Sequence, residues 1–319
     1  MSGYTVLTTM KNEGAFLLEW VAHHKALGFD NLLICTNDCA DHTRRMVFRL
    51  EAMGLARHHA TRHWPATSIQ RSALKQATRY DIVRGAEWVW VCDADEFLTV
   101  KAGDGTVQAL TAMASPGAEV ISVPWRIFGP DGRMDYDEGP ITRQFTRARR
   151  QGAPGAEGFV YGKSLFRGDL DYGRIGIHLP VPRDGAPDFK REEPGGTPWR
   201  PQHHPMFVAA DYTEAQVNHY ALRSAESFLV KRDRGRVNHV GQDMGLDYWD
   251  RFNIQEETCT AIRRYDGAVE EWLARLMADA DLAFMHRKSV AWHRARIAAL
   301  RADPGYGALW SALCERVTA

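Results

Sequence analysis

Residues 87–98 read EWVWVCDADEFL, an apolar run that stops at three carboxylates within four positions. The β-branched and aromatic residues at 88–92 are typical of a strand that is buried on both faces. Asp93, Asp95 and Glu96 follow at its carboxyl end, where open α/β sheets bind their ligands. In an extended chain Asp93 and Asp95 point the same way, because side chains repeat with a period of two. The stretch predicts a buried strand that ends in a carboxylate pair.

This carboxylate pair has two interpretations. Asp93 and Asp95 form a solvated acidic turn, or they share a cation that offsets their mutual repulsion. Mg²⁺ and Mn²⁺ prefer oxygen ligands and often share them with substrate phosphates. Spacing alone leaves both interpretations open.

Strand and helix patterns alternate on both sides of the acidic stretch. The runs 4–9, 31–36, 55–59 and 119–125 are rich in residues typical of strands. Apolar residues at helical spacing predict helices over 16–27, 41–53, 69–84 and 104–115. Asp41 is expected to cap the second of these helices. This alternation calls for a mostly parallel sheet with right-handed crossovers.

The pattern changes after residue 125. Glycine and proline are dense over 126–205, which predicts loops and short, partly antiparallel strands. A short strand is expected at 217–220, followed by a helix that Ser224 caps. From residue 248 onward the spacing is helical again. We therefore expect an α/β sheet flanked by helices, with a C-terminal helical extension.

Composition excludes several functional classes. The 319 residues include 40 Lys and Arg against 40 Asp and Glu, so the formal net charge is zero. Broad nucleic-acid binding needs a basic surface and is not expected. The five cysteines are odd in number and scattered, so no disulfide framework is implied. The sequence shows neither a signal-peptide pattern nor an apolar run long enough to span a bilayer, and we expect a cytoplasmic protein without a transmembrane segment.

Polar residues also follow two other predicted strands. They are Lys11, Asn12 and Glu13 after the first, and Asn37 and Asp38 after the second. Turn chemistry is the alternative explanation, above all for Asn37 and Asp38. The glycine-rich signatures of dinucleotide and P-loop sites and the G-x-S-x-G nucleophile elbow do not occur.

A set of motifs occurs in one order along residues 4–236. The set comprises K-N-E at 11–13, L-E-W at 18–20, L-G-F at 27–29, N-D at 37–38, Gln70, D-A-D-E-F at 93–97, W-R-I-F-G at 125–129, Lys163 and H-Y-A-L-R-S-A-E-S-F at 219–228. In these residues the chain resembles glycosyltransferases of the GT-A fold, family 2 in the broad sense, in the subgroup with a D-x-D-E-F signature. It is also similar to the related family 92. The D-x-D pair alone is unspecific, so the resemblance depends on the order of the whole set.

The resemblance implies a GT-A domain over 1–240 and a helical extension over 241–319. Within the domain, 1–125 would bind the nucleotide sugar and 126–240 would face the acceptor. The implied activity is that of a metal-dependent, hexosyltransferase-like glycosyltransferase. It would move a sugar, with inversion, from a nucleoside-diphosphate sugar, most often a UDP-sugar, to a hydroxyl of a carbohydrate or glycoconjugate acceptor. The implied cofactor is Mn²⁺ or Mg²⁺, and the oligomeric state stays open.

Residue roles carried over from the resemblance fall into three groups. The metal ligands would be Asp93, Asp95 and His219. The donor-binding residues would be Lys11, Asn12, Glu13, Asn37, Asp38, Gln70, Asp93, Arg223 and Lys231. Glu96 would support the loop or face the sugar.

The roles of His219 and of the basic residues keep alternatives, and the general base is open. His219 is either a metal ligand or a neutral core histidine. Arg223, Lys231 and Arg234 form either a basic lid over the diphosphate or a solvated basic face. Candidates for the base that takes the acceptor proton are Asp137 and Glu138. Their competitors are Asp135, Asp169, Asp171 and Asp184.

Three other functions compete with sugar transfer. A phosphohydrolase with an aspartate nucleophile would carry its D-x-D after the first strand. A nucleotidyltransferase on a related sheet would want a basic, glycine-rich loop after the first strand, which residues 11–14 provide poorly. A non-catalytic protein that binds nucleotide sugars would not need the intact Asp93 and Asp95.

Overall fold

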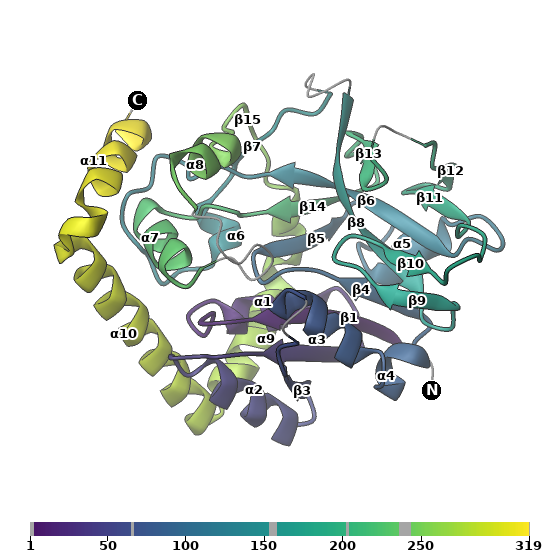
Figure 1. Cartoon of the computed structure of the whole chain (residues 1–319), viewed down its shortest axis with the longest axis horizontal. Helices are drawn as coiled ribbons and strands as arrows, with labels where there is room; N and C mark the ends of the chain where they lie inside the picture. The colour runs from purple at the N-terminus through teal and green to yellow at the C-terminus, as the bar shows by residue number, and fades with distance from the viewer. Residues whose placement is uncertain (1–2, 65–66, 153–157, 202–203, 236–243, 319) are drawn as a thin grey trace.

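A computed structural model describes residues 3–64, 67–152, 158–201, 204–235 and 244–318. In these residues an eleven-stranded sheet forms the centre of the molecule, with helices on both faces (Figure 1). Its main path runs in the order β12-β11-β6-β8-β4-β1-β2-β3. The sequence prediction of a mostly parallel α/β sheet with a C-terminal helical extension is confirmed.

One half of the sheet is wholly parallel. It consists of β4 (Trp88–Val91), β1 (Tyr4–Met10), β2 (Asn31–Thr36) and β3 (Arg57–Ala60). The crossover helices are α1 (Leu17–Ala26), α2 (Thr43–Ala52), α3 (Ile69–Ala77) and α4 (Asp81–Arg84). Parallel strands need such crossovers, and all carboxyl ends then meet at one edge of the sheet. The polar residues after β1, β2 and β4 share this edge.

The other half of the sheet is mixed. Here β8 (Phe159–Arg167) pairs antiparallel with both β4 and β6 (Val120–Ile127). The remaining elements of residues 96–209 are β5 (Glu96–Val100), α5 (Val107–Ala112), α6 (Ile141–Gln144), β7 (Arg147–Ala148), β9 (Tyr172–Ile175), β10 (Pro180–Pro182), β11 (Arg191–Glu193), β12 (Thr197–Pro198) and β13 (Phe207–Ala209). The short, partly antiparallel strands expected after residue 125 are confirmed, but the central position of β8 was not anticipated.

Strand β14 (Ala215–His219) connects distant parts of the chain. It lies parallel to β6 and antiparallel to β5, with His219 opposite Glu96. The backbone amide of Tyr220 then donates a hydrogen bond of 2.9 Å to the carbonyl oxygen of Asp95. The acidic turn after β4 is thereby fixed to the end of β14.

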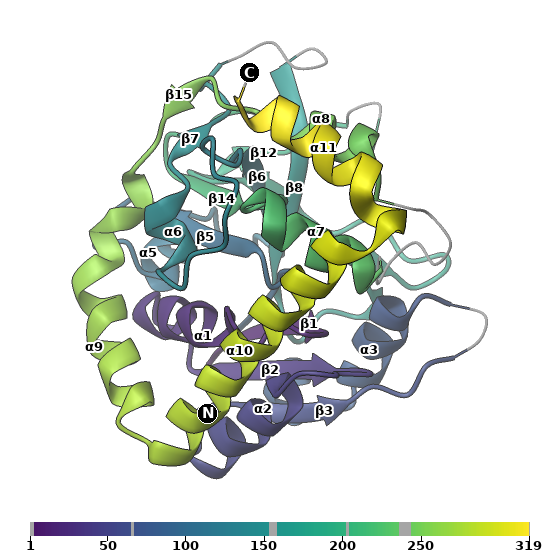
Figure 2. The ribbon, with the colours of Figure 1, turned by 90° about the vertical axis from the view of Figure 1, so that its left-hand side faces the viewer.

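The C-terminal helices cover the outside of the N-terminal half and the helix after β14. The elements are α7 (Ala225–Asp233), α8 (Leu246–Phe252), β15 (Glu257–Thr258), the 3₁₀ helix η2 (Ala261–Tyr265), α9 (Asp266–Met277), α10 (Ala280–Ala302) and α11 (Pro304–Thr318). Figure 2 shows α9 beside α1, and α10 running across α2 and α7. None of the described helices is long and apolar enough to cross a bilayer.

Apolar layers lie on the two faces of the sheet. One contains Trp20 and Trp90 with the inward residues of α1, α2 and α9, and the other contains Leu74 and Val89 with residues of α3. Trp20, Trp90 and Val89 are fully buried. The prediction that the strand at 88–91 is buried on both faces is therefore confirmed.

Several predicted boundaries were wrong. The helix expected over 69–84 is broken at Tyr80, whose backbone is extended (φ −85°, ψ 131°), and a separate short helix begins at Asp81. The helix expected over 104–115 is only Val107–Ala112, because the Thr106 side chain caps its start. Asp41 accepts a hydrogen bond from the backbone of Thr43, but His42 occupies the N-cap position of α2.

Candidate functional site

The acidic turn joins two buried strands. Asp93 and Asp95 lie in the turn, and Glu96 is the first residue of β5. Strand β5 was not anticipated, because its apolar residues from Phe97 onward follow the carboxylates directly and no turn signal separates them from the strand before. Asp95 is 7% exposed and Glu96 is 0% exposed, so the acidic stretch is not a solvated turn.

Asp93 contacts two groups from neighbouring elements. Gln70 in α3 donates a hydrogen bond of 2.5 Å from Nε2 to Asp93 Oδ1. The Lys163 ammonium in β8 lies 3.2 Å from Asp93 Oδ2. The structure therefore brings Gln70 and Asp93 together, as their shared assignment to the donor requires.

Lys163 also neutralises Glu96. Its Nζ lies 3.2 Å from Glu96 Oε2, and this oxygen accepts a hydrogen bond of 2.8 Å from the backbone amide of Asp93. Burial raises the pKa of Glu96 above its ordinary value, although the Lys163 ammonium opposes this shift. Burial alone would lower the pKa of Lys163, but Asp93 first and Glu96 second raise it above its ordinary value. Lys163 thus remains a fully buried ammonium ion.

Asp95 lies between a lysine and a histidine. Lys231 Nζ in α7 is 2.6 Å from Asp95 Oδ2, and His219 Nε2 is 3.8 Å from Asp95 Oδ1. Burial alone would raise the pKa of Asp95, but the Lys231 and Arg223 cations outweigh it and hold this pKa far below its ordinary value. Asp95 is therefore an anion throughout the physiological range.

His219 is neutral at physiological pH. Burial lowers its pKa to about 4, although Asp95 acts in the opposite direction. Its ring packs against Trp125 at 4.4 Å and Phe252 at 5.4 Å between centroids. Its Nδ1 atom is buried and has no hydrogen-bond partner among the described residues. The ring is part of the core on one side and faces Asp95 on the other, so the two alternatives for His219 do not exclude each other.

Asp95 and His219 lie close enough together to contact one divalent cation. Ligand distances near 2.1 Å put neighbouring ligands of an octahedral cation about 3 Å apart and opposite ligands about 4.2 Å apart, and the separation of 3.8 Å between Asp95 Oδ1 and His219 Nε2 falls between these values. However, no group of three or more His, Cys, Asp and Glu side chains is arranged to hold a metal ion in the described part of the chain. Asp93 therefore does not form a three-ligand metal site with Asp95 and His219, and its role as a metal ligand stays a prediction. Mg²⁺ commonly takes only one or two protein carboxylates and completes its shell with phosphate and water.

The first strand end is tied to α7 by buried ion pairs. Glu13, which is 2% exposed, pairs with Arg223 at 3.0 Å and with Arg234. Burial alone would raise the pKa of Glu13, but the two arginines lower it. Arg223 is 8% exposed, so the alternative of a solvated basic face is wrong for this residue. The carboxylate of Glu13 is already engaged, and its assignment to the nucleoside stays a prediction.

The remaining donor assignments fall on two turns at the same edge. Asn12 adopts a positive φ of 54°, and its Oδ1 accepts a hydrogen bond of 2.7 Å from the Ala40 amide. Asp38 has a φ of 41° and is exposed, and Asn37 donates to its carboxylate at 3.3 Å. The backbone carbonyl of Lys11 accepts from Arg234. Turn chemistry explains Asn12, whereas the exposed Asp38 carboxylate is open to a ligand.

Asp137 and Glu138 have partners outside the acidic turn. Glu138 forms an ion pair of 2.6 Å with Arg294 in α10, and Asp137 accepts a hydrogen bond from the amide of Gly139. Both line a surface hollow of about 630 Å³ with Arg294. Among the described residues, no hydrogen bond or ion pair joins either of them to Asp93 or Asp95, and their role as the base stays a prediction.

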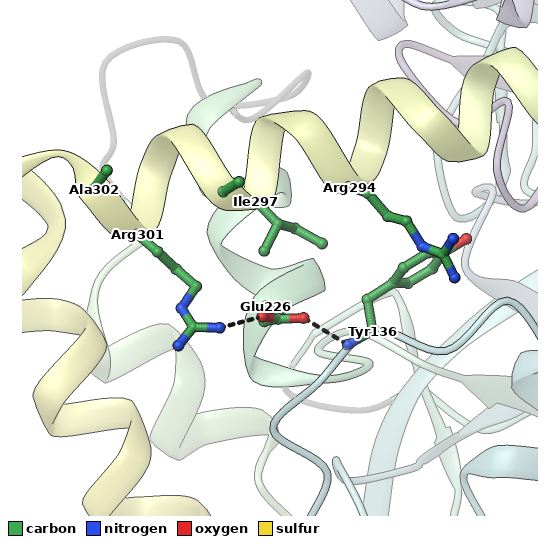
Figure 3. Close-up of a pocket in the computed structure, with 7 residues that line it drawn as sticks. Tyr136, Glu226, Arg294, Ile297, Arg301 and Ala302 are labelled. Atoms are coloured by element: carbon green, nitrogen blue, oxygen red, sulfur yellow. Dashed lines mark hydrogen bonds and ion pairs between the residues drawn. The ribbon is translucent and has the colours of Figure 1, made fainter.

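A second hollow of about 540 Å³ adjoins this one between α7 and α10 (Figure 3). Glu226 spans it, pairing with Arg301 at 2.8 Å and accepting a hydrogen bond of 2.8 Å from the amide of Tyr136. Tyr136 and Arg294 line both hollows. The polar groups in Figure 3 mainly satisfy one another, and they fix α10 to α7.

Lys163 is the site residue that residue-by-residue reasoning missed. The sequence analysis included it only within the family resemblance and gave it no role. A lysine inside the apolar run of 159–166 was the available signal, since a buried lysine needs a carboxylate partner. That partner could not be named without knowing that β8 lies beside β4.

Comparison with known proteins points to one class of enzyme. No family model matches the chain. Two curated relatives are named glycosyltransferase family 92 proteins. The one from Ricinus communis is 29% identical over 145 residues, which cover 44% of this chain and 25% of the relative. The one from Oryza sativa subsp. japonica is 28% identical over 144 residues, with 44% and 24% covered. The match thus spans about a quarter of the length of these relatives.

Solved structures give weaker likenesses. TarS of S. aureus in complex with UDP is 16% identical, with a TM-score of 0.30 over 43% of this chain and 38% of that chain. Glucosyl-3-phosphoglycerate synthase from Mycobacterium tuberculosis, in complex with Mg²⁺ and UDP, is also 16% identical, with a TM-score of 0.30 over 53% and 58%. These scores are too low to support conclusions about the site.

Proposed function

We propose that this protein is a metal-dependent glycosyltransferase that moves a sugar from a UDP-sugar to a hydroxyl of a carbohydrate or glycoconjugate, with inversion. The observation that carries the proposal is the position of the anionic Asp95 beside the neutral His219, at the edge where the ends of β1, β2 and β4 meet. The glycosyltransferase family 92 relatives support the reaction class.

The donor would lie across the parallel half of the sheet. Asp38 is open to the nucleoside, and Gln70 orients Asp93 toward the ribose or diphosphate. Asp95 and His219 would hold the divalent cation with phosphate oxygens of the donor. When bound, such a cation stabilises the negative charge that develops on the leaving diphosphate.

Lys231 and Arg223, which lie near the acidic turn, have a second role in this proposal. Lys231 and Arg223 are held near Asp95 by ion pairs and would contact the diphosphate of the donor.

Lys163 keeps Asp93 and Glu96 from repelling each other, so the turn would keep its shape when the donor binds. The acceptor hydroxyl would lose its proton to a carboxylate, for which Asp137 and Glu138 remain the candidates.

A thermal-shift panel with nucleoside diphosphates tests the donor and the metal together. We expect UDP to raise the melting temperature with Mn²⁺ or Mg²⁺ and to have no effect in excess chelator, because a ligand that binds only the native state stabilises it by mass action. Equal stabilisation by UDP in chelator would contradict the metal bridge.

A product assay separates the competing functions. A glycosyltransferase releases UDP slowly from a UDP-sugar even without acceptor, whereas a binding protein leaves the donor intact. A nucleotidyltransferase would release pyrophosphate from a nucleoside triphosphate instead. Pyrophosphate release without cleavage of any UDP-sugar would replace our proposal with that alternative.

A further inference from the structure

Three aromatic side chains form a row across neighbouring strands next to the acidic turn. The aromatic row consists of Trp125 in β6, Tyr161 in β8 and Phe207 in β13. The ring centroids of Trp125 and Tyr161 are 5.8 Å apart, and those of Tyr161 and Phe207 are 4.8 Å apart. Tyr161 and Phe207 are direct cross-strand partners, which fixes their rings on one face of the sheet.

The row is open to solvent although it is aromatic. Tyr161 is 37% exposed, and Trp125 and Phe207 are only partly buried. Other large aromatic residues of the same sheet, such as Trp90 and Phe166, are almost fully buried. One exposed ring beside two partly exposed rings is more typical of a binding surface than of a core.

One end of the row meets the candidate site. The Trp125 ring lies 4.4 Å from that of His219, which faces Asp95. Lys163 follows Tyr161 by two positions in β8, so both side chains point to the same face. The Lys163 ammonium lies 5.9 Å from the centre of the Trp125 ring and pairs with Asp93. A ligand on the row would therefore approach the place where the donor sugar is expected.

The shape and chemistry of the row fit a saccharide. One face of a pyranose ring carries axial C–H groups and packs on an aromatic ring, while its hydroxyls stay at the edge for hydrogen bonds. Adjacent strands are about 4.8 Å apart, so the three strands span roughly 10 Å, the length of about two pyranose rings. The imidazole of His178 flanks the row, with its centroid 5.1 Å from Trp125 and 5.7 Å from Tyr161, and offers a polar partner. Binding sites of this kind combine aromatic area with a few placed polar groups.

We propose that the aromatic row binds the acceptor, and that the acceptor is a saccharide of at least two sugar residues whose terminal ring lies over Trp125. This inference rests on the proposed function and adds the class of acceptor to it. The terminal hydroxyl would point toward the acidic turn, and the inner sugar would contact Tyr161 and Phe207, whose ring planes are 90° apart.

Binding of the full-length protein to an oligosaccharide array, in the presence of UDP and Mn²⁺, tests this proposal. We expect the wild type to bind at least one class of oligosaccharide, and Tyr161→Ala and Phe207→Ala each to lose about tenfold in affinity, equivalent to 1.4 kcal/mol. Tyr161→Phe keeps the ring and is expected to bind like the wild type. The matched control is Phe48→Ala, which removes a 45% exposed ring from α2, outside the row.

The outcomes separate this proposal from the proposed function. Unchanged oligosaccharide binding in Tyr161→Ala and Phe207→Ala would overturn the acceptor site. A wild type that is stabilised by UDP with Mn²⁺ but binds no oligosaccharide would overturn it as well and leave the donor proposal intact. Absence of stabilisation by UDP would count against the proposed function, whereas array binding that depends on Tyr161 would still identify the row as a saccharide site.

Discussion

Removing the buried ammonium of Lys163 is the sharpest test of how the acidic turn is held. In Lys163→Met a side chain of similar length replaces a group that is 0% exposed and lies 3.2 Å from both Asp93 and Glu96. Breaking a buried ion pair from one side costs about 3 to 5 kcal/mol, because the remaining charge is buried without a partner. Glu96 can escape part of this cost by taking up a proton, since burial already raises its pKa above the ordinary value. We therefore expect Lys163→Met to lower the free energy of unfolding by about 3 kcal/mol.

Urea unfolding of a double-mutant cycle measures this contribution. Glu96→Gln removes the charge that Lys163→Met leaves uncompensated, so the double variant is expected to be more stable than the sum of the two single losses predicts. We expect a coupling of about 1 to 3 kcal/mol, the range for residues in direct contact. Lys288→Met, at an exposed position of α10, is the control and should change stability by less than about 0.5 kcal/mol. Additive losses, or a loss in Lys163→Met no larger than that of the control, would refute the reasoning.

Three further predictions concern the site and the α7–α10 contact. Asp95→Asn keeps the shape of the side chain but removes its charge. We expect this variant to lose UDP release from UDP-sugars while its circular dichroism spectrum stays unchanged. Near-normal turnover would show that Asp95 is not a metal ligand. Asp38→Ala should mainly raise the KM for the donor, because a nucleoside contact stabilises ground and transition states alike; a large fall in kcat at constant KM would contradict this. Burial lowers the pKa of His293 from 6.5 to about 3, so its native form takes up a proton later than its unfolded form as the pH falls. Stability is then lost between pH 6.5 and 3, by up to roughly 5 kcal/mol for this group. His293→Phe should flatten this loss in urea titrations at a series of pH values, and an unchanged slope would show that His293 does not contribute.

The sequence predicted the features that depend on local pattern. The alternation of strands and helices up to residue 125, the buried strand before Asp93 and the cap at Ser224 all follow from side-chain periodicity and turn chemistry, and the structure confirms them. The assignment of His219 and Asp95 to one site came from the family resemblance, and the observed distance between His219 Nε2 and Asp95 Oδ1 is 3.8 Å. Its role as a ligand is not tested by this distance.

Features that depend on pairing between distant segments could not be predicted. A lysine at position 163 gives no sign of its partners until β8 is placed between β4 and β6. The family resemblance assigned Glu13 to donor binding, but its partners Arg223 and Arg234 flank α7, more than two hundred residues away. The periodicity of a segment predicts on which face of the strand or helix a side chain lies. It does not predict which other element packs against that face.

The position of β14 has a consequence for the synthesis of this protein. The acidic turn is complete soon after residue 100 leaves the ribosome, but β5 has no antiparallel partner until residues 215–219 follow. At roughly 5 to 20 residues per second, the delay is on the order of ten seconds. During this time β5 and β6 expose unpaired edges, which are sites of aggregation. We expect chains that stop at residue 210 to aggregate and chains that stop at residue 235 to be more soluble, which pelleting of the translation products would measure.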